Sequence, residues 1–246
     1  MKKLLKPFLK YYLKYATKLA IAIHRPTIIV VAGSVNKAFV SQEIENALKK
    51  YSLNTRISPK NFNTEFGLPL SVLGLPSGYN SFRGWWPAIK QTPKKIFSKN
   101  FPKYLVLSLG ASDPGDIKYL LSIIRPKIAV VTDITQRYLE GFASMEKLVS
   151  EYQYLAEQLP LDGLLILNYD NYRIKDIKAN CPIVSFGLQA EADWQAQEIT
   201  KTDRGQIAKI KHSNQITTQE ISRFGLHHIQ SLIIGLIVEN YVTDKK

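Results

Sequence analysis

The segment that follows the first strongly apolar run holds residues whose types and spacing suit phosphate binding. Thr27 to Val31 is an apolar run typical of a buried strand, Gly33 follows it, Lys37 comes four residues after the glycine, and a helix-period stretch comes next. A strand, a glycine-bearing loop and a helix, in that order, place backbone N–H groups and a lysine around nucleotide phosphates. The segment therefore predicts a nucleotide-binding loop built by Gly33, Ser34, Asn36 and Lys37.

Two positions of this loop hold residues that phosphate and metal chemistry do not favour. A glycine before the lysine lets the backbone wrap a phosphate, whereas this sequence has Asn36. A Ser or Thr hydroxyl after the lysine places an oxygen on Mg²⁺, whereas this sequence has Ala38. Asparagine tolerates a left-handed backbone better than most residues, but a methyl group cannot bind metal. The loop therefore predicts phosphate contact without Mg²⁺.

The elements that position this loop follow an alternating pattern. Short apolar runs suit strands buried on both faces of a parallel sheet, and they span residues 27–31, 104–109, 127–132, 163–167 and 182–186. Helical spacing marks residues 117–124, 145–159 and 226–242. The pattern predicts a doubly wound α/β domain with a mostly parallel sheet and ligands at the carboxyl ends of its strands. The segment from Ser77 to Pro102, rich in Pro, Lys and aromatic residues, is expected to be a long surface excursion.

The first 26 residues form a strongly basic segment of their own. They carry seven Lys and Arg residues and no acid, within a net charge of +13 for 246 residues. Lysines at four-residue spacing, with apolar residues between them, predict an amphipathic helix over residues 2–23. Lysines inside the apolar run argue against a membrane span. The helix either packs on the domain with its lysines in water or lies on anionic lipid, and both readings stay open.

Composition narrows the class of protein further. A 45% hydrophobic content and this length suit one large globular domain over residues 27–246. Cys181 is the single cysteine, so no intrachain disulfide is expected, and no Cys/His cluster has zinc spacing. We expect a cytoplasmic protein, with a peripheral position at the inner face of the membrane as the variant that the basic helix allows. Positive charge alone is not a recognition motif, so nucleic acid is not an expected partner.

Beyond the loop, a series of segments occurs in a fixed order along the chain. They span residues 31–37, 61–73, 105–117, 130–134, 161–170, 186–187 and 225–228. Together they resemble the Mur ligases, and within that family the MurF type, which adds D-alanyl-D-alanine to the peptidoglycan precursor. The resemblance covers the family's central ATPase domain. It implies that the basic helix replaces the family's N-terminal substrate domain and that the C-terminal domain is absent.

Mur ligases use ATP to phosphorylate a carboxylate, after which an amine displaces the phosphate. The resemblance implies that ATP or ADP is the nucleotide, and that Asn168 and Asp170 match a segment near its adenosine portion. Asn63 and Thr64 match a segment that lines the family's site. Each of these residues also has an ordinary structural role open to it, because Asn, Asp and Thr commonly form turns and caps.

The family's metal centre depends on four positions that hold other residue types here. A hydroxyl, a glutamate, a histidine and an often carbamylated lysine are expected, and the residues present are Ala38, Ser108, Tyr138 and Tyr152, respectively. Loss of all four groups predicts that no catalytic residue is retained and that Mg²⁺ is not bound.

Three hypotheses of different classes follow. The leading one is a Mur-ligase-like pseudoenzyme that binds a nucleotide, a precursor-like ligand or a protein partner in a cell-wall-related context, without ligase turnover. The second is a residual ATP-dependent acid–amino acid ligase completed by another chain, in which Asp113, Asp116 and Asp133 rebuild a metal site. The third is a membrane-surface interaction protein that binds through residues 2–23 and uses the α/β domain as a platform.

Overall fold

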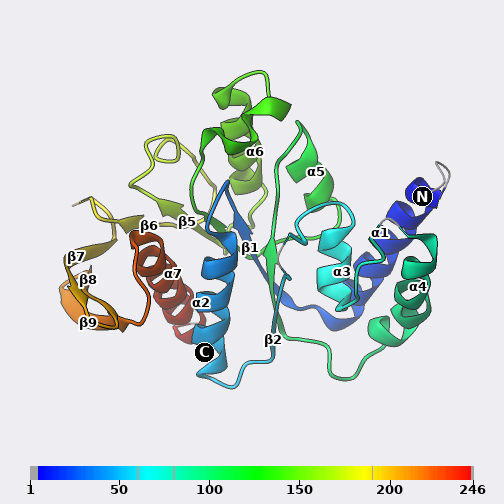
Figure 1. The fold of residues 1–246 in the computed structure, drawn as a ribbon, viewed down its shortest axis with the longest axis horizontal. Coiled ribbons are helices and arrows are strands. Elements are labelled where there is room, and N and C mark those ends of the chain that lie inside the picture. Colours follow the sequence, from blue (N-terminus) through cyan, green and yellow to red (C-terminus); the bar gives the residue numbers. More distant parts are fainter. Residues whose placement is uncertain (1–4, 60, 80, 190, 245–246) are drawn as a thin grey trace.

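The computed structural model describes residues 5–59, 61–79, 81–189 and 191–244, with the side chains of all but Leu5, Phe82, Arg137 and Tyr138. Within these residues one nine-stranded sheet runs in the order β2-β3-β1-β4-β5-β6-β7-β8-β9 (Figure 1). Its strands are β1 Thr27–Ala32, β2 Thr55–Ile57, β3 Tyr104–Ser108, β4 Ile128–Val131, β5 Leu164–Asn168, β6 Ile183–Gly187, β7 Trp194–Thr202, β8 Gly205–His212 and β9 Gln215–Ile221. The helices are α1 Leu5–His24, α2 Lys37–Lys49, α3 Gly67–Leu73, α4 Phe82–Ile96, α5 Asp116–Leu121, α6 Met145–Glu157 and α7 Leu226–Thr243, with a 3₁₀ turn, η1, over Gln136–Gly141.

The parallel part of the sheet confirms the predicted α/β class. Strands β2 to β7 pair in parallel, and the five apolar runs become β1, β3, β4, β5 and β6. Their side chains are mostly buried because helices cover both faces. The antiparallel strands β7, β8 and β9 are an addition that the apolar runs did not predict. Their residues alternate between buried and exposed or lie largely in solvent, so they lack a continuous apolar stretch.

Two apolar cores lie on opposite faces of the sheet. One is built under α2 and α7, which lie side by side (Figure 1). Their close approach needs Gly235, where a Cβ atom would meet the Glu43 carbonyl oxygen at 3.0 Å. The other core lies under α1, α3, α4, α5 and α6. The sheet therefore holds its loops between two packed helical layers, as a doubly wound fold requires.

The N-terminal helix, α1, packs on the second core. Leu9, Leu13, Ala16 and Ala20 are buried at helical spacing, so one apolar side of this helix packs on the core, while other apolar residues of the pattern stay exposed. Lys2 and Lys3, which belong to the predicted helix over residues 2–23, lie outside the described residues. Among the helices that the structure describes, none combines the length and the apolar character needed to cross a bilayer.

The expectation of a surface excursion from Ser77 to Pro102 is wrong, because this segment contains α4. The Ser81 hydroxyl accepts a hydrogen bond from the Gly84 N–H at the start of the helix. Trp85, Ala88 and Thr92 are buried on one face of α4. Pro87 and Pro93 argued against a helix in the sequence, but burial of the Trp85 face outweighs their low helix propensity.

Candidate functional site

The predicted phosphate loop lies where three strands end together. It connects β1 to α2, and β1 is flanked by β3 and β4. Val31 is in register with Ser108, and Ala32 with Val131, so the ends of β3 and β4 border the loop on its two sides. Parallel strands present their carboxyl ends at one edge, which is the usual ligand edge of such a sheet.

The loop backbone adopts the left-handed conformation that Asn36 was expected to tolerate. Asn36 has φ 65° and ψ 0° and stands directly before α2. Gly33 has φ 128°, and a Cβ atom there would lie 2.3 Å from the Thr132 hydroxyl oxygen, so only glycine fits. The Asn36 side chain makes no capping hydrogen bond at the start of α2. The first turn of this 13-residue helix begins at the loop, and a helix N-terminus favours an anion.

Hydrogen bonds from the segment after β4 hold the loop in shape. The Ser34 N–H donates to the Asp133 carbonyl at 2.6 Å, and the Thr135 N–H donates to the Ser34 hydroxyl at 3.0 Å. The Thr132 hydroxyl donates to the Val35 carbonyl at 2.8 Å. The buried Ser34 side chain thus joins the loop to the segment after β4. Sequence reasoning missed Thr132, although its place at the end of an apolar run beside the loop was a usable signal.

The loop lysine folds back over the loop. The Lys37 ammonium donates a hydrogen bond to the Gly33 carbonyl, and the residue is half-buried. Its charge therefore lies beside the loop backbone and the first turn of α2. A lysine in this position contributes a point charge to phosphate binding without the directional fork of an arginine.

A carboxylate, Asp133, lies at the mouth of the loop. Its Oδ1 accepts hydrogen bonds from the side-chain amides of Asn168 at 3.1 Å and Asn171 at 3.4 Å. Burial raises the pKa of the Asp133 carboxyl and the nearby Asp170 raises it further, whereas hydrogen bonds from Asn171, Asn168 and Asn36 lower it, and the net direction is upward. Sequence reasoning considered Asp133 only as a metal ligand and missed this amide network.

Asn168 and Asp170 support the neighbouring edge of the site. The Asn168 side chain is buried and also accepts a hydrogen bond from the Asp170 N–H at 3.0 Å. Asp170 accepts from the N–H groups of Leu188 at 2.7 Å and Gln189 at 3.3 Å, and from the Gln230 side chain at 3.0 Å. Both side chains therefore have structural partners, and their role in nucleotide binding stays a prediction.

Asn63 and Thr64 lie on the β3 side of the loop. The Gly110 N–H donates to the Asn63 carbonyl at 3.0 Å, and a Cβ atom on Gly110 would lie 2.6 Å from the Asn63 amide nitrogen. The Thr64 hydroxyl accepts from the Gly67 N–H at 3.3 Å at the start of α3. The pair is thus placed beside the end of β3, and a ligand-lining role stays a prediction.

The positions on which the family's metal centre depends do not offer a set of Mg²⁺ ligands. Ala38 is exposed in the first turn of α2 and carries no oxygen. Ser108 is buried at the end of β3, and Tyr152 is fully buried in the core under α6. The Tyr138 side chain lies outside the described residues. A hydroxyl and a buried phenol are poor substitutes for carboxylate ligands, so the donor set does not fit Mg²⁺.

Two carboxylates accept hydrogen bonds from the backbone of the segment after β3. The Asp116 carboxylate accepts from the N–H groups of Ser112 and Asp113, both at 2.9 Å. Glu151 on α6 accepts from the N–H groups of Gly115 at 2.7 Å and Ile117 at 3.0 Å at the start of α5. Across the part of the chain that the structure describes, no group of three or more His, Cys, Asp or Glu side chains could hold a metal ion.

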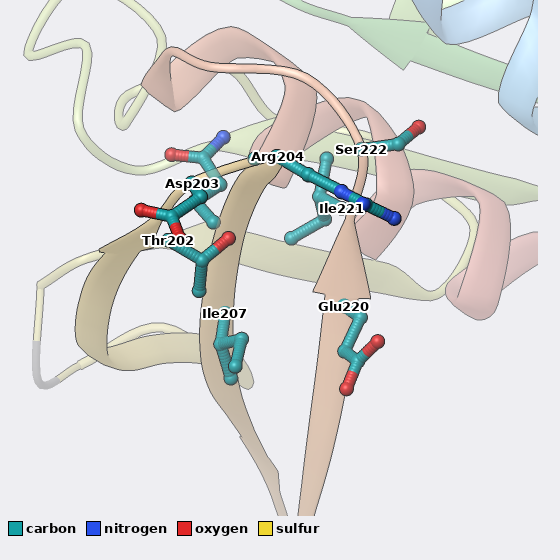
Figure 2. Close-up of a pocket in the computed structure, with 9 residues that line it drawn as sticks. Thr202, Asp203, Arg204, Ile207, Glu220, Ile221 and Ser222 are labelled. Atoms are coloured by element: carbon teal, nitrogen blue, oxygen red, sulfur yellow. The ribbon is translucent and has the colours of Figure 1, made fainter.

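An open depression of about 560 Å³ lies away from the phosphate loop (Figure 2). The turn between β7 and β8 and the end of β9 line it, with Asp203, Arg204 and Glu220 among its polar side chains. It belongs to the antiparallel end of the sheet, which β7, β8 and β9 form, whereas the loop follows β1. The loop rather than this depression is therefore the candidate site.

Fold and site together define an α/β domain with a strand–loop–helix element, the candidate phosphate site, at the carboxyl edge of a parallel sheet. A family model described as the Mur ligase middle domain matches residues 90–238, which is more than half of the 246 residues. The chain belongs to the Mur ligase family, and the match is to its middle domain.

Individual relatives agree with this assignment. The UDP-N-acetylmuramoyl-tripeptide–D-alanyl-D-alanine ligase of Buchnera aphidicola subsp. Baizongia pistaciae is 27% identical over 215 residues, which are 86% of this chain and 42% of that protein. The Escherichia coli K12 ligase of the same name is 27% identical over 144 residues, 58% of this chain and 26% of that protein. The chain therefore spans less than half the length of these relatives.

Solved structures share the fold. MurF from Acinetobacter baumannii superimposes with a TM-score of 0.77 at 17% identity, over 95% of this chain and 47% of that one. MurF from Thermotoga maritima in complex with ADP gives a TM-score of 0.77 at 20% identity, over 95% of this chain and 49% of that one. The architecture described above is that of these ligases.

Proposed function

We propose that this chain is a Mur-ligase middle domain that binds the phosphates of ATP or ADP and does not carry out ligation by itself. The observation that carries the proposal is the contrast within one site. The loop backbone and Lys37 are arranged for an anion, whereas the positions of the metal centre hold Ala38, buried Ser108 and buried Tyr152. The related MurF from Thermotoga maritima in complex with ADP supports the choice of nucleotide.

Phosphate binding would depend on three groups of this chain. The backbone N–H groups at the start of α2 would donate to phosphate oxygens, and Gly33 would let the backbone approach closely. Lys37 would turn from the Gly33 carbonyl toward the added negative charge. Asn168 and Asp170 would form the adjoining wall, with Asn168 acting through Asp133 rather than on the nucleotide itself.

Turnover would fail because charge on the transferring phosphate would not be neutralised. In phosphoryl transfer, catalysis rests on positioning and on stabilising the charge of the phosphoryl oxygens, which Mg²⁺ and its ligands normally supply. In this chain the Asp133 carboxylate lies beside the loop, where the Asn36 side chain hydrogen-bonds to it. A negative group beside the phosphates opposes this charge stabilisation.

Thermal unfolding of the full chain with ADP or ATP, with and without Mg²⁺, tests nucleotide binding. A ligand at about a hundred times its Kd stabilises by about 2.7 kcal/mol, which raises Tm by roughly 5–10 °C in a domain of this size. We expect a Tm increase that does not need Mg²⁺, that Lys37→Ala removes, and that Lys49→Ala at the far end of α2 leaves intact. Absence of any increase at millimolar nucleotide would overturn the binding half of the proposal.

A second assay tests turnover in the same preparation. Phosphate release from ATP is measured with Mg²⁺, the carboxylate substrate of a MurF-type ligase and the amine that displaces the phosphate, and no release above the Lys37→Ala background is expected. Release that depends on Lys37 would contradict the proposal and would favour a residual ligase. Recovery of release only on adding a separately produced Mur-ligase C-terminal domain would favour a ligase completed by another chain.

A further inference from the structure

The net positive charge of the chain is confined to two segments. Residues 1–26 carry seven basic side chains, residues 77–103 carry six, and neither segment contains an acidic residue. The whole chain has 33 basic and 20 acidic residues, so the residues outside these segments hold 20 of each. The excess of +13 therefore belongs entirely to the two segments, and the rest of the protein is neutral overall.

The fold brings these two segments together. They contain α1 and α4, which pack against each other at one end of the molecule (Figure 1). The Tyr12 hydroxyl donates to the Ile89 carbonyl at 3.3 Å, and the His24 ring contacts the Ile96 carbonyl at 2.7 Å. Segments more than 70 residues apart in the sequence thus form one basic end of the protein.

The side of α1 that faces away from the core is apolar as well as basic. Phe8, Tyr11, Tyr15 and Leu19 recur at spacings of three and four, so they form one stripe along the helix. All four are exposed, Phe8 by 63% and Tyr15 by 62%. Lys18, which borders this stripe, is also exposed. A packed helix normally leaves polar residues on its outer side, so this stripe needs an explanation.

The exposed side of α4 has the same character. Trp86 on α4 is exposed by 53%, and Phe97, the residue directly after α4, is exposed by 68%. Lys90 and Lys94 on the same helix are also exposed. The Lys90 ammonium lies 5.5 Å from the centre of the Trp86 ring. Large aromatic residues next to lysines are typical of surfaces that insert their rings at the level of lipid headgroups.

We propose that α1 and α4 form a docking surface for an anionic lipid bilayer, with the exposed aromatic and aliphatic side chains at the interface and the lysines on the headgroups. The two attractions add, because apolar burial and lysine–lipid attraction act on the same surface. The described helices do not span the bilayer, so binding is peripheral and reversible. The surface is independent of the phosphate loop, which lies at the carboxyl edge of the sheet.

The chemistry of the surface favours lipid over other anionic partners. Eleven of the 13 basic residues in the two segments are lysines, whereas surfaces that read nucleic acid rely more on arginine. Leu19 and Ile23 are aliphatic, and the rings of Phe8, Tyr15 and Trp86 are exposed. An acidic protein partner would be matched by the charge but would leave the apolar stripe unexplained.

Co-sedimentation of the full chain with vesicles tests the proposal. Vesicles of phosphatidylcholine alone are compared with vesicles that also contain phosphatidylglycerol, at low and physiological salt. One triple variant removes the apolar groups of the surface: Phe8→Ser, Tyr15→Ser and Leu19→Ser. A second triple variant removes its charges: Lys18→Gln, Lys90→Gln and Lys94→Gln. Two control variants change the same kinds of exposed residue elsewhere on the protein. Leu161→Ser, Tyr172→Ser and Ile216→Ser match the apolar triple, and Lys147→Gln, Lys178→Gln and Lys211→Gln match the lysine triple.

We expect binding to the anionic vesicles that weakens with salt and that each surface triple reduces by about tenfold or more, while the control triples bind like the unaltered chain. Because all substituted side chains are exposed, each variant should unfold at nearly the same temperature, and this is checked for every one. Equal binding by all variants, equal loss in surface and control triples, or binding to duplex nucleic acid without binding to vesicles would each overturn the proposal.

Discussion

The side-chain amide of Asn168 donates a hydrogen bond to the Asp133 carboxylate, with 3.1 Å between the nitrogen and the oxygen. Asp133 follows β4 and Asn168 ends β5, and the two residues meet at the edge where the phosphate loop lies. Their contact fixes a negative charge beside a loop whose other features suit an anion. The balance between this charge and the loop is the property that experiments on this protein can change most directly.

Asp133→Asn should stabilise the folded chain at neutral pH. Burial raises the pKa of the Asp133 carboxyl in the folded state, so the folded state binds this proton more tightly than the unfolded state does. The stability that the proton provides is present at acid pH and is lost as pH rises through the raised pKa. We expect a Tm increase of roughly 1–3 °C at pH 7, kept small by partial exposure of the carboxylate, and no increase below about pH 4.

Thermal unfolding across this pH range measures the effect. Asp113→Asn removes an exposed carboxylate from the neighbouring loop and serves as the charge-matched control, and its Tm should stay close to that of the unaltered chain. If the Tm advantage of Asp133→Asn grew as the pH fell, the ionised Asp133 carboxylate would stabilise the folded state, and the prediction would be wrong.

The same substitution should strengthen nucleotide binding. Removing a negative charge next to the loop lowers the repulsion that the phosphates meet. We expect the Kd for ADP to fall about tenfold, or about 1.4 kcal/mol, in low salt, and less at high salt. Isothermal titration of both variants measures this, and an unchanged Kd would place the phosphates away from Asp133.

Gly33→Ala should be severely destabilising and should abolish the loop. The new Cβ atom would lie 2.3 Å from the Thr132 hydroxyl oxygen, and φ at this position is 128°. We expect a loss of more than about 3 kcal/mol. Gly115→Ala is a matched control, because φ is 90° but no atom lies within 4 Å of the new methyl group, so the loss should be about 1–2 kcal/mol. Denaturant unfolding compares them, and equal losses would remove the steric argument.

Two adjacent tryptophans test whether α4 is part of the core. Trp85 is 4% exposed and Trp86 is 53% exposed. Trp85→Ala should lower stability by about 3–5 kcal/mol, whereas Trp86→Ala should change it by less than about 0.5 kcal/mol. Near-ultraviolet circular dichroism during thermal unfolding follows both. Small stability losses in both variants would show that α4 is not packed in the core and that this segment is a surface excursion, as the sequence predicted.

Much of the fold could be read from the sequence because its strands carry a strong signal. A strand buried on both faces, such as β1 or β4, must be apolar throughout, and the helices between them show clear spacing. The strands β7 to β9 carry no such signal, since their side chains lie partly in water. The helix α4 was missed because Pro87 and Pro93 are local features, whereas burial of Trp85 depends on α1 and α3, which are distant in sequence.

The candidate site divides in the same way. The loop residues, the left-handed tolerance of Asn36 and the altered metal positions follow from residue types and their spacing along the chain, which are local features. The hydrogen-bond partners of these residues could not be predicted from local sequence, because Asp133 meets Asn168 and Asn171 only after β4 and β5 pair. The use of Ser34 and Asp170 as structural acceptors likewise depends on contacts with Thr135 and Leu188.

The bonds that hold the phosphate loop have a consequence for how the chain acquires its site. Ser34 and Val35 are held by residues 132–135, about a hundred positions later in the sequence. Contacts of such long range form only when the intervening chain has been ordered. On the ribosome, a growing chain that has passed β1 and α2 still lacks the brace for its loop until residue 135 has emerged. The proposed nucleotide affinity would therefore arise late in synthesis, and a bound nucleotide would report that the central strands have assembled.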